Sequence, residues 1–235
     1  MATTLTDSQD FWARLEDVRS RSNVLDHSFY QRWSAGELTI DELAYYAGEY
    51  DQAVRGLAEA VAGTSDAAGE ATVRQALNAH AAEEASHIEL WGAFAEAVGT
   101  PAGALDNADR PESAQCRKVW AEAAGEGFLA GLVTLYAIES GQPEISATKL
   151  EGLRQFYGFA DGPATAYFEL HSELDKEHAA HSRKLIDEHL ADADLADADV
   201  DQLLAAADRA FAANWNLLDG VEAHFGRPPS PRAEV

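Results

Sequence analysis

The chain has 235 residues, 41 Asp and Glu against 17 Lys and Arg, and a formal charge of −24. Its length suits one domain with a buried core, and its 46% apolar share is too high for a disordered acidic segment. The acidic excess argues against nucleic acid and anionic membranes as partners, and the single cysteine, Cys116, excludes an intramolecular disulfide and favours a cytoplasmic protein.

The hydrophobic pattern has a helical period nearly throughout and no convincing strand alternation, which predicts an all-α fold. Expected helices cover residues 7–21, 27–33, 39–62, 66–98, 112–140 (one helix or a broken pair), 143–157, the stretch from the 158–163 turn to about 190, and 200–225. Thr39 and Glu42 form a capping box that should start the third helix, and Gly63 should end it. We therefore expect one helical-bundle domain over residues 1–225, followed by a disordered tail, 226–235.

Two of these helices carry the same arrangement of a histidine, an acid four residues later and a second histidine three residues after that. Positions spaced in this way fall within about 60° of one another around a helix. Mixed imidazole and carboxylate ligands suit iron, manganese or zinc, and the lack of thiolates argues against a structural zinc site. The two stripes are His80, Glu84 and His87, and then His171, Asp175 and His178.

A third helix offers a further carboxylate. Glu139 follows the most apolar stretch of the chain, residues 127–138, where a lone buried carboxylate is costly unless it is paired or bound to metal. In so acidic a chain, one Glu-x-x-His pair fits a solvated helix face equally well. By the same reasoning, the sequence is equally compatible with solvent-exposed positions for His80, Glu83 and His181.

Four segments, 27–39, 84–91, 135–145 and 167–178, resemble in their order the family of the chlamydial protein associating with death domains. The resemblance spans roughly residues 12–190. That family belongs to the haem-oxygenase-like dimetal oxidases, which implies a seven- to eight-helix bundle of the thiaminase type. The sequence departs from the chlamydial protein in two places. The spacing from Glu84 to His87 is shorter and resembles that of the fatty-acid decarboxylases of the superfamily, and Ile138 stands where the chlamydial protein has a tyrosine.

The resemblance also implies a reaction. Relatives form para-aminobenzoate for folate synthesis from one of their own tyrosines, with a lysine as amino donor; the matching residues are Tyr30 and Lys149, and Tyr46 and Tyr167 match aromatic positions of the site. The implied cofactors are two metal ions, Fe/Fe or Fe/Mn, with dioxygen and an external reductant as co-substrates. The resemblance to this family also implies a homodimer. The implied metal ligands are Glu84, His87, Glu139, His171, Asp175 and His178.

Other interpretations remain open at this point. Lysine is rare here, four against 13 Arg, and only lysine readily loses its proton to act as a nucleophile, although Lys149 also fits a solvated position. The metal centre is equally compatible with oxidative carbon–carbon cleavage of a small amino acid or a fatty acid. A metal-free binding module is the alternative from another class. A thiaminase-type reaction is disfavoured because Cys116 has no partner histidine nearby in the sequence.

Overall fold

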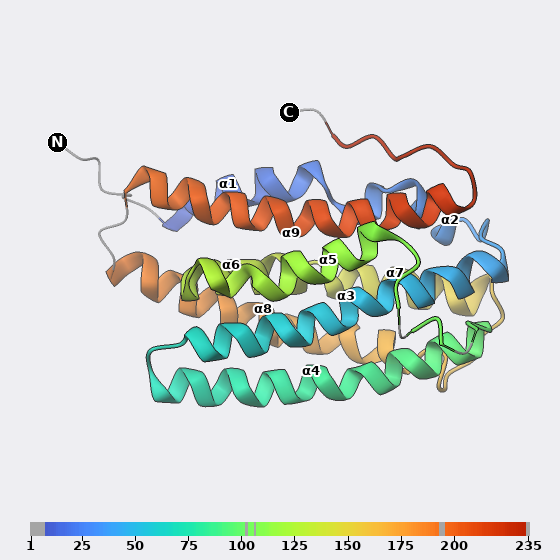
Figure 1. Ribbon diagram of the computed structural model, residues 1–235, viewed down its shortest axis with the longest axis horizontal. Helices are drawn as coiled ribbons and strands as arrows, with labels where there is room; N and C mark the ends of the chain where they lie inside the picture. The colour runs from blue at the N-terminus through green and yellow to red at the C-terminus, as the bar shows by residue number, and fades with distance from the viewer. Residues whose placement is uncertain (1–7, 102, 106, 193–195, 234–235) are drawn as a thin grey trace.

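In the described residues, 8–101, 103–105, 107–192 and 196–233, the computed structural model is helical and contains no strand, as predicted (Figure 1). Short 3-10 helices, η1 and η2, separate some of the α-helices. In chain order the elements are α1 (Ser8–Arg21), η1 (Val24–Asp26), α2 (Ser28–Ser34), α3 (Ile40–Ala67), α4 (Ala71–Val98), α5 (Pro111–Glu122), η2 (Ala123–Glu126), α6 (Phe128–Glu139), α7 (Gln142–Gln155), α8 (Ala166–Asp192) and α9 (Asp197–His224).

Helix α3 begins as the sequence predicts but ends later. Both bonds of the capping box are present, with the Thr39 hydroxyl accepting from the Glu42 amide and the Glu42 carboxylate accepting from the Thr39 amide. The predicted stop at Gly63 is wrong, because α3 continues to Ala67. A Cβ at Gly63 would make ordinary contact, 3.5 Å from the carbonyl oxygen of Ala121, so this glycine lies within the helix without ending it.

The predicted helix over residues 112–140 is a broken pair. Helix α5 ends at Glu122 and passes through η2 to Gly127, which has φ 123° and precedes α6. Because side-chain-bearing residues rarely adopt this conformation, glycine allows the chain to change direction here. The break makes α6 a separate short helix whose last residue is Glu139.

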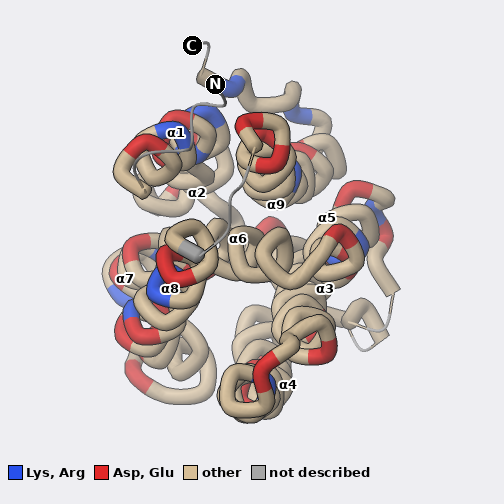
Figure 2. Tube along the Cα trace, turned by 90° about the vertical axis from the view of Figure 1, so that its left-hand side faces the viewer, with Lys and Arg blue, Asp and Glu red and all other residues tan. Residues whose placement is uncertain are grey.

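Helix α6 lies in the middle of the bundle (Figure 2). It packs against α3, α8 and α9, while α3 also packs against α4 and α5, and α7 packs against α8. Helices α1 and α9 lie along one side of the molecule and α4 along the opposite side (Figure 1). This arrangement turns the inner faces of α4, α6 and α8 toward one another.

The segment after α9 differs from the expected disordered tail. Residues 226–233 run back along the outside of the bundle, and the backbone amide of Ser230 donates to Asp219 of α9 at 2.6 Å. The indole nitrogen of Trp215 donates to the Ser230 carbonyl oxygen at 3.2 Å. The last two residues, 234–235, lie outside the described residues, as do 193–195 of the acidic linker expected over 191–199.

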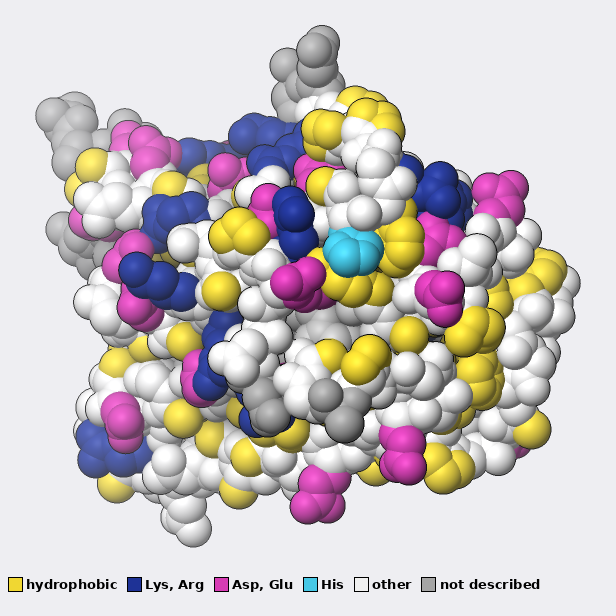
Figure 3. Space-filling model, turned by 45° about the vertical axis from the view of Figure 1, so that its right-hand side comes forward, with side chains coloured by type: hydrophobic (Ala, Val, Ile, Leu, Met, Phe, Trp, Pro, Cys, Tyr) yellow, Lys and Arg dark blue, Asp and Glu magenta, His cyan; other side chains and the backbone are white. Residues whose placement is uncertain are grey.

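The acidic surplus lies on the outside of the helices. Acidic positions follow the outward sides of the tubes in Figure 2, and Figure 3 shows acidic and basic side chains interspersed on one face. Among the described helices, none is long and apolar enough to span a membrane.

Candidate metal centre

Seven histidine and carboxylate side chains from three helices meet inside the bundle. All are at most 9% exposed except His178, whose side chain is 12% exposed. The six implied ligands therefore lie together, and His80 joins them. Helix α4 contributes His80, Glu84 and His87, helix α6 contributes Glu139, and helix α8 contributes His171, Asp175 and His178.

These residues form three overlapping groups, in each of which three ligand atoms lie within 4.8 Å of one another. Glu84 belongs to two groups and His178 to two, so the groups are adjacent and share ligands. Shared carboxylates between facing helices are the arrangement that helical bundles use to hold a pair of metal ions. The groups are Glu84, His87 and His171; Glu84, Asp175 and His178; and His80, Glu139 and His178.

The cluster leaves buried polar atoms without hydrogen-bond partners among the described residues. Both carboxylate oxygens of Glu139 are in this state, although His80 Nε2 lies 2.9 Å from one of them, because the pair lacks hydrogen-bond geometry. An unsatisfied buried polar atom costs about 1–3 kcal/mol, and more when it is charged. Five more atoms share this state: His80 Nε2, Glu84 Oε1, His171 Nε2, Asp175 Oδ1 and His178 Nδ1. This donor set fits bound cations.

Neighbouring carboxylates orient the histidine rings. Nδ1 of His171 lies 2.9 Å from Asp175 Oδ2, within the cluster, and its Nε2 has no hydrogen-bond partner among the described residues. Nε2 of His178 lies 3.3 Å from Glu83 Oε2, which leaves Nδ1 facing inward. A carboxylate on the outer ring nitrogen fixes the tautomer and the orientation of a metal-binding histidine. Glu83, 43% exposed, thus contacts the cluster from outside.

Proton affinities in the cluster are strongly coupled. Burial raises the pKa of Glu139. Burial alone lowers the pKa of His80, but the adjacent Glu139 and Glu84 carboxylates raise it to about 10. In the protein without a cation, protonated histidines thus offset the carboxylate charge. A metal ion that binds would replace these protons as the source of positive charge.

A second cluster surrounds Lys149, which is 2% exposed. Its Nζ lies 4.6 Å from the centre of the Tyr50 ring, 4.9 Å from that of Tyr30 and 5.4 Å from that of Tyr46. The hydroxyls of Tyr30 and Tyr46 are 3.0 Å apart. Burial lowers the pKa of Lys149 well below its usual range, which favours the neutral, nucleophilic amine.

Aromatic rings connect the two clusters. The Tyr167 ring lies 4.2 Å from the ring of His171 and 4.9 Å from that of Trp91. The Trp91 ring in turn lies 5.2 Å from Tyr50 and 5.9 Å from Tyr46. Tyr167 therefore lies at the histidine end of this series of contacts, while Tyr46 lies beside Lys149.

Sequence reasoning missed two members of these clusters. His80 was open to a surface position, but the structure buries it against Glu139 of α6. Tyr50 was not singled out at all, yet it lies nearest to Lys149 among the three tyrosines around it. The signal was present in both cases: His80 belongs to the first stripe, and Tyr50 follows Tyr46 by four residues, on the same face of α3.

Cys116 is buried and its thiol is free. Burial raises the pKa of this thiol, which favours its protonated, less nucleophilic form.

The sequence of this chain is similar to those of several known proteins. Residues 45–211 match a family described as iron-containing redox enzymes. The chain is 32% identical to a 4-aminobenzoate synthase of Nitrosomonas europaea, over 92% of each protein. It is 28% identical to a 4-aminobenzoate synthase of Chlamydia trachomatis, over 89% of this chain and 91% of that protein.

Solved structures share the fold. A TenA homologue from Pseudomonas syringae pv. tomato superposes with a TM-score of 0.78 at 16% identity, over 92% of each chain. A domain with a haem-oxygenase-like fold from Shewanella denitrificans superposes with a TM-score of 0.73 at 17% identity, over 93% of this chain and 91% of that one. These matches confirm the predicted haem-oxygenase-like, thiaminase-type bundle.

Proposed function

The chain belongs to the family of iron-containing redox enzymes, and we propose that it forms 4-aminobenzoate, with its own Tyr30 as the source of the ring and Lys149 as the source of nitrogen. The names of its relatives support this product. The observation that carries the proposal is the pairing of the two clusters: the rings of Tyr167 and Trp91 connect buried ligand atoms without partners to a buried amine enclosed by tyrosines.

The seven clustered residues are suited to hold two ions, either two irons or one iron and one manganese. Glu84 and His178 each belong to two of the ligand groups, and together with the remaining histidines and carboxylates they would hold the two ions. When bound, such ions supply the oxidising power of dioxygen, with electrons from an external reductant. Imidazoles and carboxylates together stabilise more than one oxidation state of iron.

The chain's own residues would provide the substrate. In this reaction the Cα–Cβ bond of Tyr30 breaks, Cα takes a hydrogen in its place and becomes a glycine, and Cβ is oxidised to the carboxyl group. At the other end of the ring, the C–O bond is replaced by a C–N bond from Lys149, whose Cε–Nζ bond then breaks and whose Cε is oxidised to an aldehyde. Two dioxygen molecules, with two electrons and two protons from the external reductant, balance these changes, and two waters leave, one of which carries the phenol oxygen. The 4.9 Å distance from Nζ to the ring centre places the amine beside the ring it must reach.

Tyr46 and Tyr167 have supporting roles in this scheme. Tyr46 contacts the Tyr30 hydroxyl at 3.0 Å, which fixes the orientation of the ring to be converted. Tyr167 stacks near His171 and lies between the metal side and the rings around Lys149. Burial raises the pKa of both hydroxyls, so both remain protonated donors near neutral pH.

The direct experiment combines a product assay with mass spectrometry of the protein. The chain, loaded with iron under anaerobic conditions, is exposed to dioxygen and a reductant. We expect 4-aminobenzoate, loss of one tyrosine side chain mapped to Tyr30, and a change at Lys149 that reflects loss of its nitrogen. We also expect no more than about one product per chain, because each chain holds one Tyr30.

Two variants separate the roles. Tyr30→Phe should abolish the product while leaving iron binding intact, and Lys149→Met should do the same. Tyr136→Phe is the matched control, because Tyr136 lies outside both clusters and is only half-buried. Repeated turnover with an intact Tyr30 would contradict self-conversion and would point to an external substrate.

A further inference from the structure

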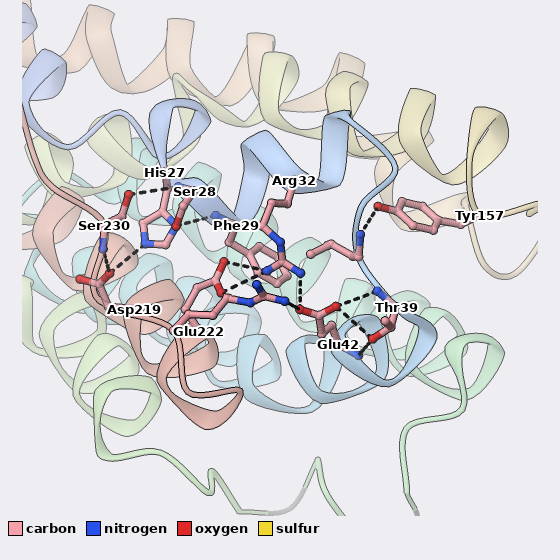
Figure 4. A network of polar contacts seen from close by, with 12 residues as sticks. His27, Ser28, Phe29, Arg32, Thr39, Glu42, Tyr157, Asp219, Glu222 and Ser230 are labelled. Carbon is pink, nitrogen blue, oxygen red and sulfur yellow. Dashed lines mark hydrogen bonds and ion pairs between the residues drawn. The ribbon is translucent and has the colours of Figure 1, made fainter.

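Helix α2, which carries Tyr30, is a seven-residue helix, and its outer side is held by residues that lie about 200 positions away in the sequence (Figure 4). We name residues 226–233 the C-terminal strap. The strap runs past α2 and contacts α9 and the first turn of α2. A helix of this length has little stability of its own, so its position depends on what holds it.

At its first turn, α2 is fixed by His27, Asp219 and Ser230. The Ser28 amide donates to the Ser230 hydroxyl at 3.1 Å, and the Phe29 amide donates to His27 Nδ1 at 3.1 Å. Because Nδ1 accepts this bond, the proton of a neutral His27 is on Nε2, which lies 3.1 Å from Asp219 Oδ1. The first turn is thus tied to α9 and to the strap at once.

At its last turn, α2 is fixed through ion pairs. Arg32 pairs with Glu42 of α3 and with Glu222 of α9. Arg227 of the strap pairs with the same two carboxylates, at 2.8 Å and 2.9 Å. The strap therefore contacts the groups that hold both ends of the helix.

The composition of the strap suits this role. Pro228, Pro229 and Pro231 flank Ser230 and restrict the backbone, which lowers the entropy that ordering the segment costs. Ser230 uses three of its groups at once, because its amide donates to Asp219, its hydroxyl accepts from Ser28 and its carbonyl accepts from Trp215.

Between the two fixed ends, Tyr30 points into the bundle and is 2% exposed. On the inner side of the same helix, the Trp33 indole nitrogen donates to the backbone oxygen of Lys149 at 3.0 Å. We propose that the C-terminal strap, through Ser230 with Asp219 and His27, positions α2 so that the Tyr30 ring stays at reactive distance from Lys149. His27, Asp219 and Ser230 are positioning residues in this view, and the inference rests on the proposed function.

The test uses Asp219→Ala, Asp219→Asn and Ser230→Ala in the full chain, with two measurements. The first is amide hydrogen exchange of residues 28–34, and the second is the single-turnover rate of Tyr30 loss at saturating iron and dioxygen. Asp201→Ala is the matched control, since Asp201 lies on the same helix and forms an exposed ion pair with Arg14.

We expect Asp219→Ala to speed amide exchange in α2 and to slow Tyr30 loss about tenfold, since it removes two hydrogen bonds to a charged acceptor. Asp219→Asn keeps an acceptor oxygen and should restore most of the rate of Tyr30 loss. The rate for Ser230→Ala should lie between those of Asp219→Ala and Asp219→Asn. Iron stoichiometry should be unchanged in all variants, which separates displacement of α2 from general unfolding.

Each alternative outcome is distinct. Unchanged exchange of residues 28–34 in Asp219→Ala would show that the strap does not hold α2. Faster exchange with an unchanged rate of Tyr30 loss would overturn the positioning role. If the unmodified chain does not lose Tyr30 at all, the proposed function fails, and the exchange measurement still decides whether the strap holds the helix.

Discussion

His80 Nε2 and Glu139 Oε1 lie 2.9 Å apart, although they belong to different helices, α4 and α6, and are 59 positions apart in the chain. Neither atom has a hydrogen-bond partner with proper geometry among the described residues. A buried imidazole and a buried carboxylate that meet in this way add little net stability as an ion pair, because desolvation offsets most of the attraction between buried charges. Both belong to a group of side chains whose atoms are close enough together to hold a metal ion.

The first prediction concerns this pair. Glu139→Gln should weaken iron binding by more than the roughly 10- to 100-fold that loss of an outer hydrogen-bond partner costs at a metal site. His80→Ala should weaken it in the same direction. Anaerobic iron titration against a chromophoric chelator measures both effects. Glu173→Gln, at a side chain 78% exposed on α8, is the control, and equal affinities for Glu139→Gln and the unmodified chain would contradict a metal role.

The second prediction concerns the burial of Lys149. Because burial lowers the pKa of its amine, the unfolded chain binds a proton that the folded chain does not, at every pH between the lowered value and the usual 10.5. Stability therefore rises with pH in this range, and each unit of pKa difference is worth about 1.4 kcal/mol. Lys149→Met removes this dependence.

Chemical denaturation from pH 7 to pH 10 measures the effect. Lys149→Met should be more stable than the unmodified chain at pH 7, and the difference should shrink as the pH approaches 10. Lys184→Met, at a side chain 73% exposed, should show no such trend. A constant difference across the range would mean that the folded state does not desolvate the Lys149 amine.

A third prediction follows from the close approach of α2 and α7. A Cβ at Gly152 would lie 2.6 Å from Cδ1 of the Trp33 ring, so Gly152→Ala forces this buried ring to move. We expect a loss of about 1–3 kcal/mol in the free energy of unfolding, which is typical of overpacking. Thermal unfolding would detect it.

Gly92→Ala is the matched control for that substitution. Gly92 lies inside α4, and a Cβ there would meet nothing within 4 Å. Alanine should stabilise the helix by about 0.5–1 kcal/mol. The two changes are chemically identical and opposite in expected sign, so equal effects would show that the contact with Trp33 carries no constraint.

The fourth prediction concerns acid stability. Burial raises the pKa of Glu42, but hydrogen bonds from the Thr39 backbone, Arg32 and Arg227 outweigh this effect and lower the pKa to about 2. The unfolded chain therefore takes up this proton first as the pH falls, and the stabilisation is present above the usual 4.5 and is lost between there and about 2. Glu42→Gln should cost about 1–2 kcal/mol at neutral pH, given that solvent screens the partly exposed arginines.

Denaturation curves between pH 7 and pH 3 check this result. The difference between Glu42→Gln and the unmodified chain should narrow as the medium becomes acidic. Glu37→Gln, at an exposed position near the start of α3, serves as the control. A difference that stays constant down to pH 3 would contradict a lowered pKa for Glu42.

Much of the local structure followed from the sequence. Helical periodicity and the Thr39–Glu42 capping box located the helices to within a few residues, because these signals depend on hydrogen bonds between near neighbours. The end of α3 was misplaced, because a glycine inside a helix costs only about 1 kcal/mol and does not by itself end the helix.

The sequence by itself determined which helix faces could bind metal, because ligand spacing along one helix fixes which side chains share a face. It also singled out Glu139, since a carboxylate after an apolar stretch is costly without a partner. Only the tertiary structure decided that His80 meets Glu139, that Tyr50 lies beside Lys149, and that the strap returns to α2. These relationships depend on how helices pack across the bundle, and no local pattern specifies which faces meet.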